Sequence, residues 1–293
     1  MIMNMSAGAN IQPVVGKLLS TLNVGDTLEV PVVSDWQSRF GANIVWKVAD
    51  KNHAGYPTDS VTLITDRIIQ LMASDAKEPS NSNSDRRSYG NNRHIYSNLL
   101  QWLNSNATAG NWYSPKHSAD APPTNANVRY NEYDGWAGFL AMLDSKFVSE
   151  LLDTTLAVVK SSTDGGSYET FTAKMFIAST TEAGLANENG IAEGALLALF
   201  SDNASRIAYP TAECVSNSEY TDSNFTTSKG WYWWLRTPLS SSPRYVRRVN
   251  TDGGQDGFDA YSGIHGVRPL CNLPGSLRVS ESPNAAGNYT LLD

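Results

Sequence analysis

Residues 230–238 read GWYWWLRTP and residues 266–270 read GVRPL, and these two blocks dominate the C-terminal part of the chain. Both are rich in the aromatic, apolar and β-branched residues that favour strands. Between them, residues 239–265 mix Ser, Asn, Asp, Gly, Tyr, Arg and His, a composition typical of an antibody combining site rather than of a core. Rigid strands that enclose an adaptable polar segment predict a binding surface, and this chemistry indicates recognition rather than catalysis.

The composition is that of a globular, acidic protein. The chain has 293 residues, of which 41% are hydrophobic and 17% charged, and its formal net charge is −7. The only basic clusters, Arg86-Arg87 and Arg244, Arg247 and Arg248, are too small to follow a phosphate backbone, so we expect no nucleic-acid partner. Cys214 and Cys271 are too few for a disulfide framework, and we expect two buried thiols, although one disulfide between them is possible.

Neither a signal peptide nor a membrane span is expected. Residues 1–10 lack a basic and an apolar region, and no apolar run approaches the ~20 residues that cross a bilayer. We therefore expect no membrane insertion and synthesis in a cytoplasm. Because the composition resembles that of extracellular proteins, a virion component, made inside a host and used outside it, satisfies both observations.

The pattern along the chain predicts one α+β domain over residues 23–293, preceded by an arm at 1–22 for attachment or oligomerisation. Residues 14–22 are compatible with a short helix in this arm. The expected fold has mixed antiparallel sheets, two main helices and long loops. We expect strands at 27–32, 44–48 and 61–65 as a meander, although residues 64–72 fit a helix equally well. Helices are expected at 94–104 and 139–152, strands at 155–160 and 174–179, a short helix at 192–200, and closing strands at 231–236, 245–250 and 267–273.

Five motifs carry a resemblance to a known family: IVWKV at 44–48, SNLLQWLN at 97–104, KMFIASTTE at 174–182, WLRTP at 234–238 and GVRPLCNL at 266–273. Over about residues 25–273 the chain resembles a domain of unknown function common in gut bacteria and their phages. Many such domains resemble the variable proteins of diversity-generating retroelements. That resemblance implies a C-type-lectin-like fold of the formylglycine-generating-enzyme-like branch, and a reverse transcriptase that rewrites adenines in codons near the C-terminus.

The resemblance implies a variable region at about residues 239–268. Its Ser, Asn, Tyr, Phe, Gly, Ile and His residues are types that adenine changes in Asn and Tyr codons reach. By contrast, Tyr245, Val246, Val249 and Asp252-Gly253 are expected to be framework. The expected ligand-binding residues are Ser240, Ser241, Ser242, Arg244, Arg248, Asn250, Gln255, Asp256, Phe258, Tyr261, Ser262, Ile264 and His265.

Several of these residues have a structural alternative. Trp231, Trp233 and Trp234 favour core packing over sugar stacking, and Arg236 and Arg268 favour bridging of backbone carbonyls over ligand binding. His265 is expected to be an exposed contact residue, since no nucleophile is specified beside it. The acids at 252, 256 and 259 fit no standard calcium loop and are expected to be solvated, so no metal and no cofactor is predicted.

The leading hypothesis is a hypervariable, non-enzymatic receptor-binding protein that determines phage tropism, with a cell-surface protein or glycan as its receptor. Such a protein would be a homo-oligomer or attached to the virion, since multivalent display raises avidity; display on a bacterial cell is the alternative location. Two other functions remain open. One is an oxidase related to formylglycine-generating enzymes, for which Cys214 and Cys271 would be the reactive pair. The other is a structural virion decoration protein without a receptor.

Overall fold

The expected meander lies at the centre of the larger sheet. The computed structural model describes residues 16–292, and its six-stranded sheet has the order β15-β2-β3-β4-β13-β8. β2 pairs antiparallel with β3, and β3 with β4, which confirms the meander, whereas β15 joins β2 as a parallel neighbour. The strands are β2 (Thr27–Pro31), β3 (Asn43–Lys51), β4 (Ser60–Thr65), β8 (Met175–Phe176), β13 (Leu270–Pro274) and β15 (Asn288–Thr290). Every residue of β4 is buried, so both faces of the sheet are covered there.

The second sheet contains the C-terminal segment. Its order is β11-β10-β9-β12-β5, and only β12 and β9 pair in parallel. The expected single strand over 267–273 is divided between the two sheets, because Pro269 has no amide hydrogen with which to continue a ladder. The strands are β5 (Gln70–Leu71), β9 (Trp233–Pro238), β10 (Tyr245–Val249), β11 (Gln255–Asp259) and β12 (Gly266–Val267).

Two short ribbons complete the β-structure. β6 (Thr154–Val159) pairs antiparallel with β7 (Tyr168–Ala173), and β1 (Lys17–Leu18) pairs antiparallel with β14 (Arg278–Val279). The strand expected at 155–160 is confirmed as β6. Within the stretch 174–179 only Met175–Phe176 pair as a strand, β8, while the partner of β6 is β7, where no strand was expected.

The helices between residues 16 and 292 are short, none longer than six residues. The helix expected at 94–104 is α3, preceded by a 3-10 turn, and the one expected at 139–152 is split into α4 and α5 because Asp144 caps a new start. The helix expected at 192–200 is wrong: Gly194, with φ +138°, interrupts it. The helices are α1 (Gln37–Phe40), α2 (Ser84–Tyr89), α3 (Asn98–Leu103), α4 (Phe139–Met142), α5 (Ser145–Ser149), α6 (Asn203–Arg206) and α7 (Ala212–Ser216). The α+β class is therefore confirmed, with less helix than expected.

The described end of the expected arm is part of the domain. Residues 1–15 lie outside the described residues, but β1 pairs with β14, and Leu19 and Leu22 are fully buried in the larger hydrophobic cluster. Instead of the short helix, residues 17–21 form β1 and a 3-10 turn. Residues 17–22 thus pack on the rest of the domain, and the attachment or oligomerisation role of the arm stays a prediction.

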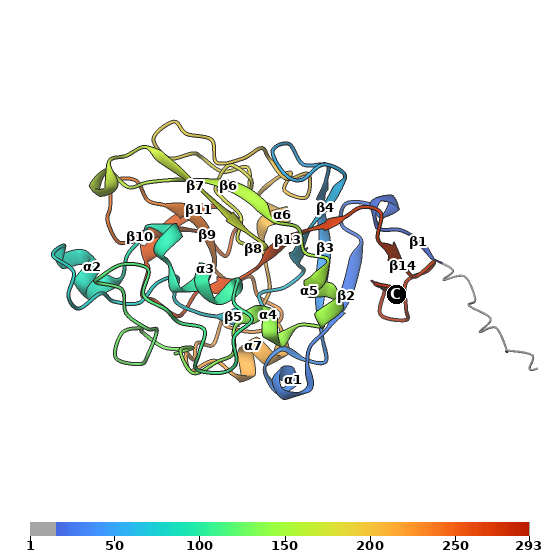
Figure 1. Ribbon diagram of the computed structural model, residues 1–293, viewed down its shortest axis with the longest axis horizontal. Coiled ribbons are helices and arrows are strands. Elements are labelled where there is room, and N and C mark those ends of the chain that lie inside the picture. The colour runs from blue at the N-terminus through green and yellow to red at the C-terminus, as the bar shows by residue number, and fades with distance from the viewer. Residues whose placement is uncertain (1–15, 293) are drawn as a thin grey trace, which may run out of the picture.

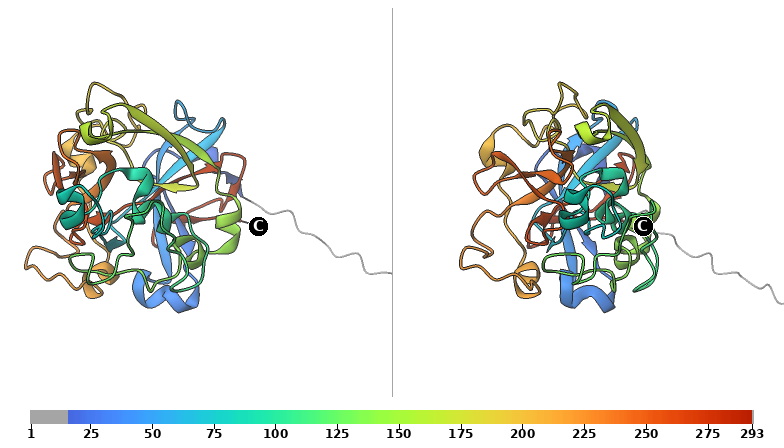
Figure 2. Two further views of the ribbon diagram at one scale, coloured as in Figure 1. Left: turned by 60° about the vertical axis from the view of Figure 1, so that its left-hand side comes forward. Right: turned by 90° about the vertical axis from the view of Figure 1, so that its left-hand side faces the viewer.

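The two ends of the long axis differ in what they carry. β10, β11 and α2 lie at one end, whereas β1, β14 and the C-terminus lie at the other (Figure 1). In the left view of Figure 2 the orange-red hairpin segment again lies on the side away from the C-terminus. A protein held near its C-terminus would thus present the β10–β11 hairpin outward.

Candidate ligand-binding surface

The β10–β11 hairpin presents many of the side chains that the sequence singled out. Its strands pair from Tyr245 opposite Asp259 to Val249 opposite Gln255, and residues 250–254 form the turn. Among residues 16–292, β11 has no neighbouring strand other than β10, so it is an edge of the sheet. Val246 and Val249 are buried, as expected for framework positions.

β9, the strand beside the hairpin, is buried on both faces. Trp233 belongs to the smaller hydrophobic cluster and Trp234 to the larger one, because successive strand residues point in opposite directions. The two indole nitrogens donate to backbone carbonyls at 3.0 and 2.8 Å. Trp231 is buried as well. The expected packing role of these tryptophans is confirmed, and it gives the hairpin a rigid support.

Arg236 and Arg268 join backbone segments, as expected. Arg236 donates to the carbonyls of Ala157 and Ile177 at 3.1 and 3.0 Å, and to both carboxylate oxygens of Glu182 at 2.6 Å. Arg268 donates to the carbonyl of Thr65 through two nitrogens, at 3.2 and 2.9 Å. Because a guanidinium carries five donors in one plane, Arg236 ties several segments together. Arg268 ties its own segment to the end of β4.

The loop at 239–245 is held by residues far from it in sequence. The buried side-chain amide of Asn92 donates to three carbonyls of this loop, at 2.6, 3.0 and 3.4 Å. Arg86 donates from Nε to the carbonyl of Pro243 at 3.2 Å. Every residue type has a backbone carbonyl. These hydrogen bonds therefore do not depend on which side chains occupy positions 240–244.

The loop at 260–264 is held in the same way. The amide of Asn131 donates to the carbonyl of Gly263 at 2.6 Å, and the backbone N–H of Arg129 donates to the carbonyl of Tyr261 at 2.9 Å. In return, the backbone N–H of Gly263 donates to the carbonyl of Arg129 at 2.8 Å. Both loops that flank the hairpin are thus held through main-chain atoms, and in the first loop the hydroxyls of Ser240 and Ser242 add side-chain hydrogen bonds.

Three expected ligand-binding residues are not exposed. His265 and Ser262 are fully buried and Arg248 is only 7% exposed, so their expected exposure is wrong. Arg248 donates from Nη1 to His265 Nε2, which leaves Nδ1 of the neutral imidazole to donate to the carbonyl of Ser262 at 3.2 Å. Burial, and secondarily the charge of Arg248, holds the pKa of His265 well below its usual value. This histidine is a neutral support beneath the hairpin.

The remaining expected residues reach the surface to different degrees. Ser241 and Asp256 are exposed. Arg244 lies over the ring of Tyr89 at 4.0 Å and contacts Asp259 at 3.3 Å, so it is half-buried against framework residues. The other half-buried positions are Ser240, Ser242, Asn250, Gln255, Phe258, Tyr261 and Ile264.

A family model matches residues 59–275, which is more than half of the chain, and its description is a domain of unknown function, DUF6273. The chain belongs to the DUF6273 family. No curated protein and no solved structure matches it. The DUF6273 segment contains β4 to β13, and therefore the hairpin and the residues that hold its loops.

The DUF6273 segment also contains a hollow that the sequence analysis missed. Its volume is about 640 Å³, and it lies between residues 207–232 and the hairpin. We call it the aromatic hollow. Its aromatic lining residues are Tyr209, Tyr220, Trp231, Tyr232 and Phe258. In the sequence, only the clustering of aromatic residues at 209–232 could have indicated this hollow. The fold is needed to bring these residues near Phe258.

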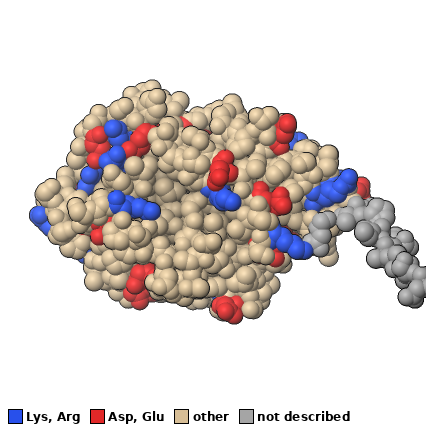
Figure 3. All heavy atoms as spheres, in the orientation of Figure 1, with Lys and Arg blue, Asp and Glu red and all other residues tan. Residues whose placement is uncertain are grey.

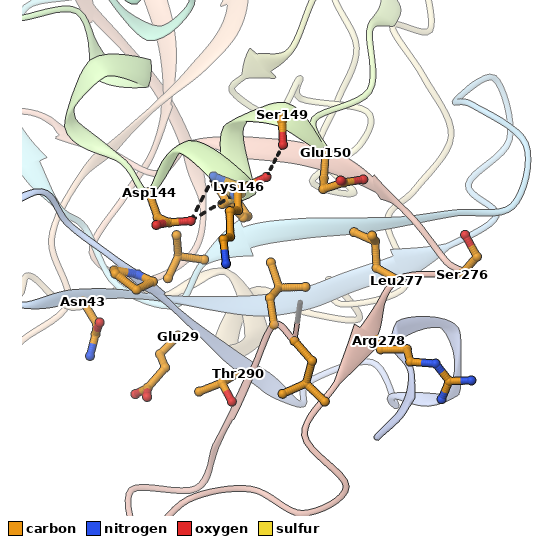
Figure 4. A pocket seen from close by; sticks show the side chains of 15 residues that line it. Glu29, Asn43, Asp144, Lys146, Ser149, Glu150, Ser276, Leu277, Arg278 and Thr290 are labelled. Atoms are coloured by element: carbon orange, nitrogen blue, oxygen red, sulfur yellow. Dashed lines mark hydrogen bonds between the residues drawn. The ribbon is translucent and has the colours of Figure 1, made fainter. Parts of the chain in front are cut away.

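A second hollow, of about 660 Å³, lies near the C-terminus, where α5 faces β2 and the β14–β15 segment (Figure 4). Asp144 accepts hydrogen bonds from the backbone of Lys146 and Phe147, which fixes the start of α5 above this hollow. Many of its lining residues, among them Glu29, Ser276 and Leu291, lie outside the DUF6273 segment. It is therefore less closely connected with the family than the aromatic hollow.

The thiols of Cys214 and Cys271 are free and fully buried, in different hydrophobic clusters. Burial raises the pKa of both. This confirms the expectation of two buried thiols. Between residues 16 and 292, no group of three or more His, Cys, Asp or Glu side chains is arranged to hold a metal ion.

Charge is sparse on the face shown in Figure 3, where scattered blue and red groups lie partly beside each other and partly alone. Near the hairpin, Arg247 donates to Glu188 at 2.6 Å and Arg248 to Asp256 at 2.9 Å. The basic side chains of the C-terminal segment are thus paired rather than available to a phosphate backbone. In the described part of the chain, no helix has the length and hydropathy needed to cross a bilayer.

Proposed function

We propose that the protein binds a receptor through the β10–β11 hairpin and its flanking loops, and that a retroelement diversifies this surface. Its role would be that of a phage tropism determinant in the virion, with a cell-surface protein or glycan as receptor. The observation that carries the proposal is the support of loops 239–245 and 260–264 through their backbone carbonyls. Such support permits side chains to change without a change in the course of the chain.

The C-type-lectin-like fold, in its formylglycine-generating-enzyme-like branch, belongs to the same proposal. It is supported by the α+β content, the short helices and the long irregular connections around two sheets. Burial of both thiols speaks against the oxidase alternative, since a buried thiol with a raised pKa is a poor nucleophile.

A pair of displayed libraries tests the tolerance that the proposal requires. The first randomises Ser241, Arg244 and Asp256, and the second randomises the buried Val246, Val249 and Ala260 of the same segment. We expect most members of the first library to fold and most of the second to unfold, measured by protease resistance on the display host. Equal loss of folded members in the two libraries would contradict the proposal.

Binding to host cells tests the receptor role. Members of the first library, selected on different bacterial strains, are expected to bind the strain of their selection and not the others. If the parent protein and all folded members bind every strain equally or none, the hairpin is not a receptor-binding surface. The gene neighbourhood tests the retroelement. If no reverse-transcriptase gene and no near-copy of codons 239–268 lie beside the gene for this protein, the retroelement part of the proposal fails.

A further inference from the structure

The aromatic hollow has the dimensions and lining of a small-molecule site. Its volume of about 640 Å³ lies within the roughly 300–1,000 Å³ of ligand pockets. Tyr209 is 39% exposed, and Tyr220, Tyr232 and Phe258 are half-buried, so their rings are in part accessible. Partly exposed aromatic rings gathered in one hollow are unusual for a surface that has no ligand.

The rings are packed around Trp231. Trp231 donates from its indole nitrogen to the carbonyl of Ile264 at 2.9 Å, and Phe225 packs on its ring with centroids 4.9 Å apart. The centroids of Tyr220 and Tyr232 lie 6.2 and 5.4 Å from that of Trp231. The aromatic lining is therefore pre-organised, which lowers the entropy cost of binding a flat ligand surface.

One wall of the hollow belongs to the hairpin. The guanidinium of Arg248 lies between the rings of Tyr232 and Phe258, 4.1 and 4.7 Å from their centroids. Asp256 neutralises the charge of this arginine at 2.9 Å. Arg248, Phe258 and Ile264 are expected variable positions, whereas Tyr220, Trp231 and Tyr232 precede the expected variable region. We call Tyr220, Trp231 and Tyr232 the platform of the hollow, and Phe258 and Ile264 its hairpin wall. The expected diversification would change the wall and leave the platform unchanged.

The polar groups of the hollow are balanced in charge and in hydrogen-bonding type. Lys229 donates to Asn224 Oδ1 at 2.8 Å, and the hydroxyl of Tyr220 donates to Asp222 at 3.3 Å. With Ser228 and Thr251, the rim offers ammonium, amide, hydroxyl and carboxylate groups. Such a rim provides both donors and acceptors without an excess of either charge.

A neutral sugar matches this lining better than other small ligands do. A pyranose ring has a face of C–H groups that packs on an aromatic ring, and hydroxyls at its edge that both donate and accept hydrogen bonds. An anionic ligand would meet no unpaired cluster of basic groups here, and a purely apolar ligand would leave the polar rim desolvated without partners.

We propose that the aromatic hollow binds a neutral oligosaccharide, stacked on Tyr220 and Tyr232 and contacted by Phe258 and Ile264 of the hairpin side. This inference rests on the proposed function, because it names the receptor class of the same surface. The platform supplies affinity common to hexopyranosides, and the hairpin wall selects among them.

The test uses the full chain and a glycan array that carries neutral oligosaccharides of glucose, galactose, mannose and N-acetylglucosamine beside sialylated and sulfated ones. We expect binding confined to neutral members, confirmed by calorimetry with the best of them. Tyr220→Ala should weaken that binding roughly tenfold, and Tyr220→Phe should retain most of it, since the ring is kept. Tyr168→Ala, at a tyrosine that is 57% exposed on β7, is the matched control and should bind as the parent does.

Three outcomes would overturn the inference: binding to no glycan, preference for the charged glycans, or equal binding by Tyr220→Ala and the parent. These are distinguishable from failure of the proposed function. If the hairpin libraries change strain choice while Tyr220→Ala binds every strain as the parent does, the receptor role stands and the sugar site fails. If Tyr220→Ala abolishes glycan binding while no hairpin library alters strain choice, the sugar site stands and the diversified surface fails.

Discussion

Asn92, Arg86 and Asn131 hold the loops beside the hairpin by donating to backbone carbonyls. A hydrogen bond to a backbone carbonyl does not depend on the side chain of the residue that carries this carbonyl. Asn92 joins three carbonyls of one loop from a position about 150 residues away, and it is almost completely buried. These residues are therefore expected to matter more for the shape of the surface than any residue within it.

Glu193 is a buried acid in the network that holds Arg236. It accepts a hydrogen bond from the backbone N–H of Val159 at 2.8 Å and another from the hydroxyl of Thr237. Burial raises its pKa from 4.5 to about 7, although the charge of Arg236 opposes the shift. The folded state therefore holds this proton more tightly than the unfolded state does.

We expect the free energy of unfolding to fall as the pH rises from about 4.5 to about 7. Stability from the protonated acid is complete below the pKa of the unfolded state, and is lost as the pH passes the folded pKa. Glu193 contributes a slope of about 1.4 kcal/mol per pH unit in this window. Glu193→Gln should remove that part of the slope in urea denaturation at several pH values, whereas Glu281→Gln, at an exposed position, should not. Equal slopes for the parent and Glu193→Gln would contradict the assignment.

At the scale of the element, the hairpin depends on one tight turn. Gly253 has φ +80°, in the left-handed region, and a Cβ atom there would lie 1.9 Å from the carbonyl oxygen of Asn203. Gly254 follows with no positive φ, and its nearest neighbour would be a side-chain oxygen of Asp252 at 3.1 Å. The turn therefore requires glycine at the first position and not at the second.

Gly253→Ala is expected to lower the unfolding free energy by about 3 kcal/mol or more. The strain of a left-handed alanine and the overlap of its Cβ atom with the backbone of Asn203 both contribute. Gly254→Ala, the matched control, should cost less than about 1 kcal/mol, because only a side chain needs to move. Chemical denaturation of the two variants measures the difference. Similar losses for both would show that the turn is not held against α6.

At the scale of the whole molecule, the residues next to the described start of the chain belong to the core. Leu19 and Leu22 are fully buried in the larger hydrophobic cluster, whereas Leu18 between Lys17 and Leu19 is 40% exposed. The same segment pairs with β14, at the end of the molecule opposite the hairpin (Figure 1). Support of the domain thus begins before residue 23.

Leu19→Ala and Leu22→Ala are each expected to lower the unfolding free energy by about 2–5 kcal/mol, since each leaves a cavity in the core. Leu18→Ala should change it by less than about 1 kcal/mol. Thermal and urea unfolding of the three variants compare them directly. If all three variants changed the unfolding free energy by less than about 1 kcal/mol, residues 17–22 would be an arm separate from the domain.

Much of the fold was predictable because its signals are local. The alternation in β2, β3 and β4, the aromatic block in β9 and the carbonyl-bridging role of Arg236 follow from spacing and side-chain chemistry within a few residues. The prediction of a helix at 192–200 was wrong because the backbone conformation of Gly194 interrupts a segment whose composition favours a helix. The burial of His265 was missed because it depends on Arg248 and Trp234, which approach it only in the folded chain.

The sequence by itself determined the α+β class, the strands around the C-terminal segment and the separation of framework from polar residues along that segment. Only the tertiary structure decided which polar residues face solvent, how Asn92 and Asn131 hold the loops, and that Tyr220 and Trp231 lie beside Phe258. The reason is physical: strand periodicity is written in neighbouring residues, whereas a hydrogen bond or a ring contact across 30 to 150 residues exists only after the chain has brought its partners together.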